Sequence, residues 1–269
     1  MKPRSSSPIG VFDSGLGGLS VLQHIRQQLP HENLVYVADS QFAPYGEKGE
    51  AFVIERALFI SRFLAELPVK ALVVACNTAT AAAVAELRKT FSMPIVGIEP
   101  GVKPAMSTTK TGVVGVLATS ETVRSDKYAR LVSPYGGQKV ITQPCPGLVD
   151  EIEAMNLDGQ KLRSLLTRYL APMLDAQADT IVLGCTHYSF IAPLIQEIAG
   201  ENVRLIDTGA PVAVELFRRL NKQNLLHLEK VQTPPQFYTS AVPARMEEIF
   251  AQFWGEKATI QPLPSQCPE

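Results

Sequence analysis

Two cysteines, Cys76 and Cys185, occur in segments that read alike and lie 109 residues apart. Each follows a short apolar run, 71–75 or 181–184, and each precedes polar residues that can begin a helix. The pattern therefore predicts one thiol at the end of each of two strands. If those ends face each other, one thiol could remove a proton from a carbon atom while the other returns a proton to the opposite side.

Two further pairs of segments repeat at nearly the same offset. Residues 10–14 correspond to 115–119 at an offset of 105, and residues 97–101 correspond to 205–209 at an offset of 108. One such pair could be chance, because strand ends in parallel sheets resemble each other. Three pairs in one order predict an internal duplication with a site between the halves.

The composition is that of an ordinary globular protein, with 269 residues, 46% hydrophobic and 19% charged. A net charge of -1 gives no electrostatic reason to expect a nucleic-acid or membrane partner. No apolar run approaches the roughly 20 residues that a membrane span needs. Four cysteines, with no apolar signal-peptide core at the N-terminus, predict reduced thiols and a cytoplasmic location.

Strand and helix patterns alternate along the chain. The clearest amphipathic helix covers 162–174, and Pro172 is expected to kink it or end it early. A last helix is expected at 244–253, followed by a loose tail at 261–269. The strand patterns cover 9–12, 34–38, 72–75, 95–98, 113–117, 181–183 and 203–206, with two more near Val140 and Phe237. The alternation predicts an α/β fold with mostly parallel sheets flanked by helices.

Four chemically useful residues fall where predicted strands end, namely Asp13, Cys76, Thr119 and Cys185. In parallel α/β sheets, ligands bind at the carboxyl ends of the strands. This coincidence is the main structural reason to expect a site at these residues.

The glycine-rich segment 13–18 permits two interpretations. A dinucleotide-binding loop would need a third glycine at position 20, where the chain has Ser20, although Asp39 lies about where a ribose-binding acid would. We favour glycines that let backbone amides approach a small anion, such as a carboxylate, at a helix N-terminus. A tight turn capped by Ser14 is the plainer alternative.

The cysteines also have an ordinary interpretation, because free thiols are commonly buried and inert. The start of a helix favours the thiolate of Cys76 and Cys185, whereas Cys145 and Cys267 lack such a context and are interpreted as structural and incidental. His187 could be a general acid, a helix cap or a metal ligand. Zinc held by Cys76, Cys185 and His187 is disfavoured because the chain has no close Cys-x-x-Cys or His-x-x-x-His pair.

Four threonines could donate hydrogen bonds to a carboxylate, and each could equally cap a helix; they are Thr78, Thr119, Thr122 and Thr186. Glu153 reads from the sequence alone as a solvated helix charge, like its neighbour Glu151.

Together these segments resemble the cofactor-independent glutamate racemases. The resemblance rests on Phe12–Val21, Pro44–Lys48, Ala75–Ala79, Ala118–Val123, Leu183–His187 and Asp207–Gly209. It implies two similar α/β domains related by a pseudo-twofold axis, with the active site between them. The first domain would comprise 1–98 plus 210–269, and the second 99–209. The implied role is the supply of D-glutamate for peptidoglycan.

The resemblance also implies roles for individual residues. Cys76 would take the α-proton from D-glutamate and Cys185 from L-glutamate, assisted by Asp13 and His187, with Glu153 as a second carboxylate. The implied substrate contacts are Asp13, Ser14, Pro44, Tyr45, Gly46, Cys76, Asn77, Thr78, Thr119, Thr122, Cys185, Thr186 and His187.

The chemistry of the residues is compatible with this family. No lysine context suggests a pyridoxal phosphate Schiff base, so we expect no cofactor and no metal. Glutamate is the expected small-molecule partner, and the sequence leaves the oligomeric state open, with a homodimer as one candidate. The competing functions are a sibling racemase acting on aspartate or a hydantoin, a decarboxylase or isomerase of the same architecture, and a binding protein that closes on an amino acid without turning it over.

Overall fold

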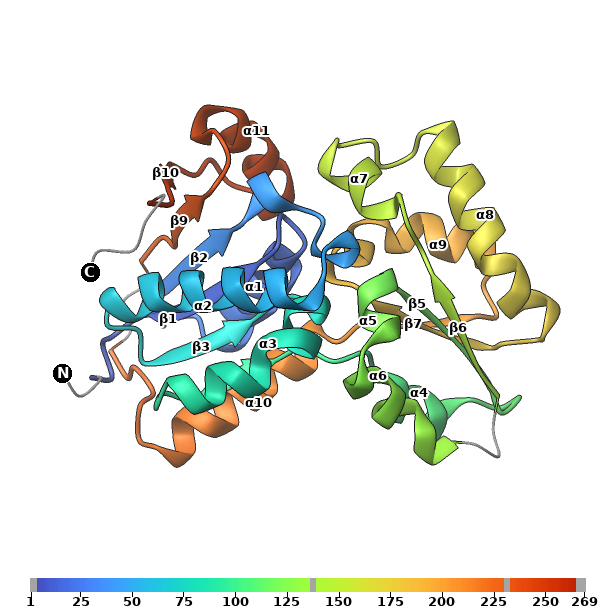
Figure 1. Cartoon of the computed structure of the whole chain (residues 1–269), viewed down its shortest axis with the longest axis horizontal. Coiled ribbons are helices and arrows are strands. Elements are labelled where there is room, and N and C mark those ends of the chain that lie inside the picture. The colour runs from blue at the N-terminus through green and yellow to red at the C-terminus, as the bar shows by residue number, and fades with distance from the viewer. Residues whose placement is uncertain (1–3, 136–138, 230–232, 265–269) are drawn as a thin grey trace.

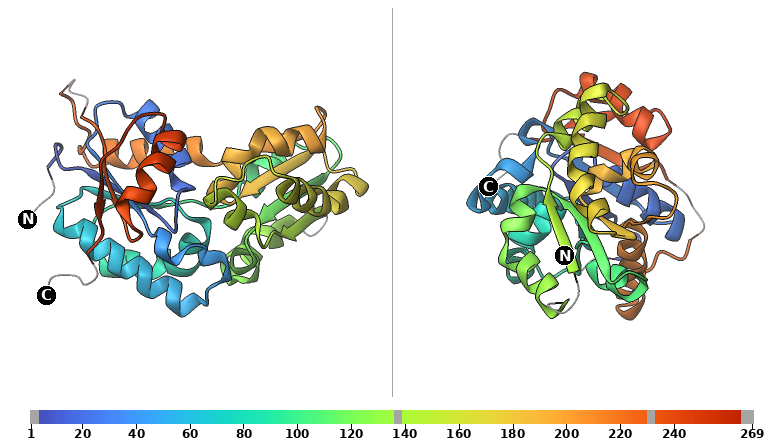
Figure 2. Two further views of the ribbon diagram at one scale, coloured as in Figure 1. Left: turned by 90° about the horizontal axis from the view of Figure 1, so that it is seen from above. Right: turned by 90° about the vertical axis from the view of Figure 1, so that its right-hand side faces the viewer.

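The computed structural model describes residues 4–135, 139–229 and 233–264, and it folds into two lobes that lie side by side (Figures 1 and 2). One lobe contains a six-stranded sheet and the other a four-stranded sheet. All strand pairs in the described ranges are parallel. The prediction of an α/β fold with mostly parallel sheets is therefore confirmed.

The first lobe begins with four strands and their crossover helices. Its strands are β1 (Ile9–Asp13), β2 (Leu34–Ala38), β3 (Ala71–Val74) and β4 (Ile95–Gly97). Its helices are α1 (Gly18–Gln28), α2 (Glu50–Glu66) and α3 (Asn77–Thr90), with short 3₁₀ turns at η1 (Ser40–Phe42) and η2 (Tyr45–Glu47). All residues of β1, β2 and β3 are buried, as expected for parallel strands covered by helices on both faces.

The second lobe repeats this plan. Its strands are β5 (Val113–Ala118), β6 (Lys139–Pro144), β7 (Thr180–Gly184) and β8 (Arg204–Ile206). Its helices are α4 (Val102–Thr108), α5 (Ser120–Arg124), α6 (Asp126–Val132), α7 (Leu148–Glu153), α8 (Gln160–Asp175) and α9 (Ala192–Ala199), with 3₁₀ turns at η3 (Ser133–Tyr135) and η4 (Thr186–Ile191).

The strand orders of the two sheets match. The first sheet contains the order β2-β1-β3-β4, and the second is β6-β5-β7-β8. The three repeated segments of the sequence therefore occupy equivalent places, at β1 and β5, β3 and β7, and β4 and β8. This correspondence is what an internal duplication predicts.

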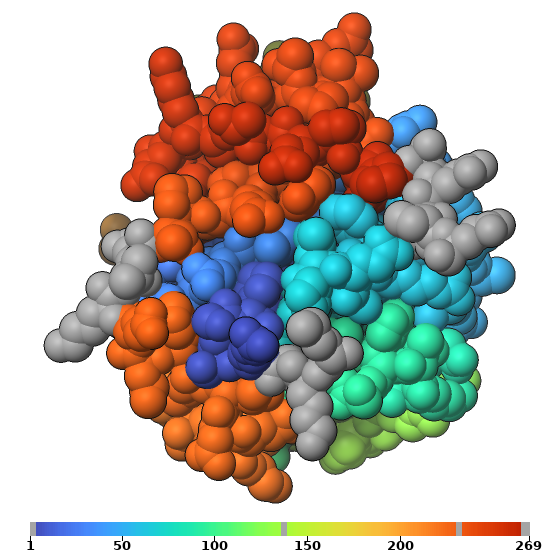
Figure 3. Space-filling model, turned by 90° about the vertical axis from the view of Figure 1, so that its left-hand side faces the viewer, coloured from blue at the N-terminus to red at the C-terminus, as the bar shows by residue number. Residues whose placement is uncertain are grey.

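The last quarter of the chain returns to the first lobe. Helix α10 (Gly209–Lys222) packs against α1, and β9 (Gln236–Thr239) adds to the first sheet beside β2. Helix α11 (Pro243–Trp254) and β10 (Ile260–Pro262) complete it. Figure 3 shows the N-terminal and C-terminal segments together on one face of this lobe. The sheet membership agrees with the expected division of the chain, and the boundaries at 98/99 and 209/210 stay a prediction.

Each sheet is covered on both faces by apolar packing. In the first sheet, alternate side chains such as Val11 and Val73 pack with α1, α10 and α11, while Phe12 and Val74 pack with α2 and α3. In the second sheet, one face packs with α7, α8 and α9 and the other with α4 and α6. This layering leaves the loops at the carboxyl ends of the strands free to meet a partner loop.

Three details differ from the sequence predictions. Helix α8 continues through Pro172 to Asp175, because Tyr169 and Met173 anchor the turn on either side and only one backbone hydrogen bond is lost. Residues 120–131, whose pattern predicts a single helix, form two short helices that are divided where Ser125 caps α6. The tail is not loose at its start, because Ile260–Pro262 pairs with β9, while residues 265–269 lie outside the described ranges.

No helix in the described part of the chain combines the length and apolar character needed to span a bilayer.

Candidate active site between the two lobes

The strand ends bring the predicted site residues together in pairs. In the first sheet, Phe12 is in register with Val74, so Asp13 and Cys76 leave adjacent strands at the same edge. In the second sheet, Ala118 is in register with Gly184, so Thr119 and Cys185 do the same. Each lobe therefore presents one thiol at the carboxyl edge of its central strands.

Asp13 is fully buried at the end of β1. Its Oδ1 accepts a hydrogen bond from the backbone N of Ser14 at 2.7 Å, and its Oδ2 accepts one from Gly18 N at 2.5 Å. The hydroxyl of Thr186, from the other lobe, donates to the same Oδ2 at 3.2 Å. Burial raises the pKa of Asp13, although the charge of His187 and these backbone donors act in the opposite direction.

Cys76 is the N-cap of α3 and is 4% exposed. Its Sγ accepts a hydrogen bond from Ala79 N at 3.4 Å and lies 3.7 Å from Ser14 Oγ. Burial raises the pKa of the Cys76 thiol well above its usual value, and the negative charges of Asp13 and Cys185 add to this effect. Burial therefore outweighs the effect of the helix start, and the expectation that this position favours the Cys76 thiolate is wrong. The thiol is protonated and lies next to the Asp13 carboxylate, which can exchange a proton with it.

Cys185 has a different neighbour. Its Sγ lies 3.7 Å from Nδ1 of His187, and Nε2 of His187 lies 2.6 Å from Oε1 of Glu153. Burial lowers the pKa of His187, but the contacts with Cys185 and Glu153 outweigh it and raise the pKa well above its usual value. The sulfur of Cys185 therefore has a protonated imidazole as its neighbour.

The glycine-rich loop of the first lobe lies directly against these groups. Leu16 N donates to Glu153 Oε1 at 2.7 Å, and Gly17 N lies 3.3 Å from Nε2 of His187. A Cβ built on Gly15 would lie 2.0 Å from Oε1 of Glu153, and one on Gly17 would lie 2.4 Å from Nδ1 of His187. The glycines are thus needed for close approach of the two lobes.

This finding corrects the favoured interpretation of the loop. The amide of Leu16 bonds to a carboxylate of the protein, and the amides of Ser14 and Gly18 bond to Asp13, so these donors are not free for a substrate anion. The dinucleotide alternative is also wrong, because Asp39 is buried in an ion pair with Arg56 and cannot bind a ribose.

Three predicted threonines form one cluster that joins the lobes. Thr78 Oγ1 lies 2.9 Å from Thr119 Oγ1 and 3.3 Å from Thr122 Oγ1, and Thr119 donates to Thr122 at 2.9 Å. Gly46 packs against the same cluster, since a Cβ there would lie 2.6 Å from Cβ of Thr119. These hydroxyls supply donors at the edge of the interlobe space.

Asn77 is buried beside this cluster. Its Nδ2 lies 3.5 Å from the carbonyl oxygen of Ile98, whereas its Oδ1 has no hydrogen-bond partner among the described residues. Buried polar atoms are rarely left unpaired, so this oxygen is available to a ligand donor.

The Pro44–Gly46 segment is held by Asp39 and Arg56, neither of which was expected to contact it. The Tyr45 hydroxyl donates to Asp39 Oδ2 at 2.5 Å, and Arg56 binds both carboxylate oxygens of Asp39. Tyr45 is 1% exposed, so its hydroxyl is committed to Asp39 in this structure. No sequence pattern links Arg56 to Asp39 or Asp39 to Tyr45, so the sequence could not indicate these contacts.

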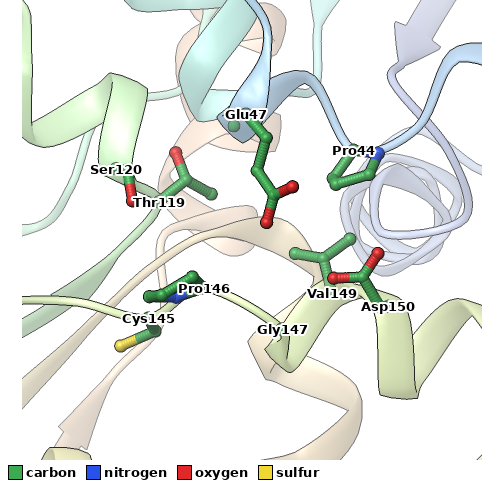
Figure 4. Close-up of a pocket in the computed structure, with 10 residues that line it drawn as sticks. Pro44, Glu47, Thr119, Ser120, Cys145, Pro146, Gly147, Val149 and Asp150 are labelled. Carbon is green, nitrogen blue, oxygen red and sulfur yellow. The ribbon is translucent and has the colours of Figure 1, made fainter.

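A narrow pocket opens between the lobes and is drawn in Figure 4. It encloses about 240 Å³ of space, counting its open mouth, and the Glu47 carboxylate points into it. Its lining includes three predicted substrate contacts, Pro44, Gly46 and Thr119, together with Cys145. Neither Cys76 nor Cys185 lines it, and both thiols are buried in this structure.

The other cysteine and metal predictions have different outcomes. Cys145 is 2% exposed and donates to the carbonyl of Gln143 at 3.2 Å, as a structural thiol would, while Cys267 lies outside the described ranges. Within the described ranges, no three His, Cys, Asp or Glu side chains converge closely enough to hold a metal ion. Cys76, Cys185 and His187 therefore do not form a zinc ligand set in this structure.

Comparison with known proteins gives one consistent family. The family model described as Asp/Glu/Hydantoin racemase matches residues 9–216. A glutamate racemase from Stutzerimonas stutzeri is 50% identical over 262 residues, which cover 97% of this chain and 98% of that protein.

Solved structures agree with this result. The crystal structure of glutamate racemase isoform RacE1 from Bacillus anthracis is 33% identical, with a TM-score of 0.89 over 97% of this chain and 99% of that one. The Escherichia coli glutamate racemase, solved with L-glutamate and the activator UDP-MurNAc-ala, is 32% identical, with a TM-score of 0.84 over 97% and 98% of the two chains. With a family model that spans most of its length and relatives this similar along the whole chain, the protein belongs to the Asp/Glu/hydantoin racemase family.

Proposed function

We propose that this protein is a glutamate racemase, which interconverts L-glutamate and D-glutamate through the thiols of Cys76 and Cys185. The observation that carries the proposal is that each lobe contributes one buried thiol at an equivalent strand end, Cys76 beside Asp13 and Cys185 beside His187. The choice of glutamate rests on the glutamate racemases that match nearly the whole chain. The supply of D-glutamate for peptidoglycan in the cytoplasm is the corresponding cellular role.

In the direction from D- to L-glutamate, the Cys76 thiol first gives its proton to Asp13. A raised pKa suits Asp13 to this task, because its carboxyl holds the proton more firmly than an exposed aspartate would. The Cys76 thiolate then takes the α-proton from one face of the substrate. The Cys185 thiol donates its own proton to the opposite face and becomes a thiolate, which the protonated His187 stabilises.

The reverse direction exchanges the roles of the thiols. The Cys185 thiolate that the forward direction leaves takes the α-proton from L-glutamate, while the Cys76 thiol returns a proton to the other face. Asp13 then gives its proton back to the Cys76 thiolate, which restores the starting state. Glu153 keeps His187 protonated and fixes its ring through the 2.6 Å contact, so it acts as a positioning residue.

The carbanionic transition state needs stabilisation because the α-proton of an amino acid is very weakly acidic. The hydroxyl cluster of Thr78, Thr119 and Thr122 and the unpaired Oδ1 of Asn77 are polar groups close to the interlobe space. Closure of the lobes would exclude water and strengthen these interactions. We propose that these residues, with Ser14, the Pro44–Gly46 segment and Thr186, bind the substrate.

The competing functions predict different outcomes. Two thiols in matched positions favour racemisation over decarboxylation and over simple binding, since neither of those needs a proton carrier on each face. An aspartate racemase would use the same thiols on a substrate shorter by one methylene. A hydrophobic slot alone discriminates such a difference by about 10 to 200-fold. We expect stronger discrimination, because a misplaced side-chain carboxylate would also leave buried donors unpaired.

The test is to incubate purified protein with L-glutamate and follow the loss of optical rotation, with L-aspartate in parallel. We expect racemisation of glutamate that persists after exhaustive chelation and without added pyridoxal phosphate. Comparable kcat/KM for aspartate would overturn the substrate assignment, and stable optical activity of both amino acids would overturn the proposed function. The homodimer stays a prediction, which light scattering of the same preparation tests.

A further inference from the structure

A buried ion pair between Arg56 and Asp39 contacts the Pro44–Gly46 segment through Tyr45. The guanidinium of Arg56, on α2, donates from Nε to Asp39 Oδ2 at 2.9 Å and from Nη2 to Asp39 Oδ1 at 2.8 Å. The Asp39 side chain is fully buried and that of Arg56 is 15% exposed. Such a two-pronged contact fixes both the position and the plane of the carboxylate.

The Arg56 guanidinium is also fixed by aromatic rings. It lies 4.1 Å from the centroid of Phe42 and 4.7 Å from that of Phe59. Phe42 in turn packs with Phe52 at a centroid distance of 5.9 Å, and Phe52 packs edge-on with Tyr45 at 6.3 Å. The Arg56 guanidinium and the rings of Phe42, Phe52, Phe59 and Tyr45 therefore restrict one another to one packed arrangement.

The carboxylate of Asp39 connects Arg56 to the Pro44–Gly46 segment. Its Oδ2 accepts the Tyr45 hydroxyl at 2.5 Å while it is bound to Arg56. Tyr45 begins the short turn that contains Gly46, and Gly46 packs against Thr119 of the other lobe. Arg56 is thus linked through two side chains to a segment that touches the interlobe space.

We propose that Arg56 is a positioning residue for glutamate binding, which acts through Asp39 and Tyr45 on the Pro44–Gly46 segment. The inference rests on the proposed function, because it needs the substrate to contact this segment. Without the guanidinium, Asp39 would be a buried carboxylate with one donor removed on each oxygen, and it would turn or take up a proton. The Tyr45 hydroxyl and the turn that follows would lose their fixed place.

The expected effect falls on KM rather than on kcat. The segment would contact the substrate away from the carbon that exchanges its proton, so its contacts act on bound substrate and transition state alike. For Arg56→Met, we expect KM for glutamate to rise about tenfold, which corresponds to about 1.4 kcal/mol of lost binding. We expect kcat to stay within about threefold of the wild-type value. For Arg56→Lys, the rise is smaller, because a lysine keeps the charge but lacks the planar fork.

A double-mutant cycle tests whether Arg56 acts through Tyr45. Tyr45→Phe removes only the hydroxyl that Asp39 accepts and keeps the ring contacts. If Arg56 acts through this hydroxyl, the double variant Arg56→Lys/Tyr45→Phe will raise KM no more than the larger single change does. If the two effects multiply, Arg56 and Tyr45 act independently and the proposal is overturned. These two conservative changes carry the test if Arg56→Met does not fold.

The matched control is Arg62→Met, on the exposed side of the same helix. Arg62→Met should have the KM and kcat of the wild type. A rise in its KM equal to that of Arg56→Met would overturn the proposal. Unchanged KM in folded Arg56→Met, or a fall in kcat with unchanged KM, would also overturn it. Wild-type protein that does not racemise glutamate would instead refute the proposed function, so the two failures are distinguishable.

Discussion

The carboxylate of Glu153 lies 2.6 Å from Nε2 of His187, and the same oxygen accepts a hydrogen bond from Leu16 of the other lobe at 2.7 Å. One side chain therefore both orients the imidazole beside Cys185 and contacts the glycine-rich loop of the opposite lobe. The proton chemistry at Cys185 is in this way connected to contact between the lobes.

Glu153→Gln removes the charge of this side chain and keeps its shape. Because Glu153 helps to raise the pKa of His187, the variant should have a lower His187 pKa, measured by NMR titration of the imidazole. We expect kcat to fall by about tenfold. This loss is smaller than the roughly 10²–10⁴-fold loss expected when a proton-transferring group itself is removed. An unchanged His187 pKa would contradict this account.

The same variant has a pH-dependent stability. The pKa of His187 is higher in the folded protein than its unfolded value of about 6.5. The contribution of His187 to the free energy of unfolding is therefore fully present below pH about 6.5, and it is lost as the pH rises through the pKa of the folded protein. Urea unfolding should show a larger deficit for Glu153→Gln at pH 6 than at a pH above the folded pKa. A loss in the free energy of unfolding that grows as the pH rises would contradict this account.

Gly15→Ala tests the close approach of the lobes. The added Cβ would lie 2.0 Å from Oε1 and 2.9 Å from Cδ of Glu153, so the carboxylate must move away from His187. We expect a loss of about 1–3 kcal/mol in the free energy of unfolding together with a fall in kcat. Gly49→Ala is the control, because nothing lies within 4 Å of a Cβ there. As a change at the N-cap of α2, it should cost less than about 1 kcal/mol and keep wild-type kcat.

Much of the fold and part of the site could be predicted from the sequence. The apolar runs before Cys76 and Cys185 indicated two equivalent strands, and the matched strand orders confirm them. The role of Glu153 could not be derived from its own segment, since its partners Leu16 and His187 are distant in the chain and meet only in the folded protein.

The two lobes also differ within the repeated segments. Asp13, beside Cys76, corresponds to Ala118 in the second lobe, which has no carboxylate to offer. The second lobe instead supplies His187 and Glu153 from η4 and α7. A repeat pattern indicates equivalent backbone positions, but it does not show which side chains replace one another in chemistry. The Arg56–Asp39–Tyr45 network could not be predicted from the sequence for a similar reason, because only folding brings α2 against the segment after β2.

Substrate protection tests whether the thiols share one interlobe site. Cys76 and Cys185 are 4% and 7% exposed, so alkylation requires the lobes to open. Glutamate should hold the lobes closed and slow the labelling of both thiols, while the labelling of Cys267 stays unchanged. Mass spectrometry of peptides after timed alkylation measures each rate. Equal labelling of Cys76 and Cys185 with and without glutamate would count against a shared site.

The central claim is that each thiol serves one face of the substrate, and single Cys→Ser variants test it most directly. Serine keeps the shape of cysteine but ionises far less readily, so each variant should lose racemisation, which needs both proton carriers. Elimination from a glutamate analogue with a leaving group at the β-carbon needs only removal of the α-proton, and should survive on one face. The account predicts elimination from the L analogue by Cys76→Ser and from the D analogue by Cys185→Ser. Racemisation at the wild-type rate in either variant, or equal elimination from both enantiomers in both variants, would contradict it.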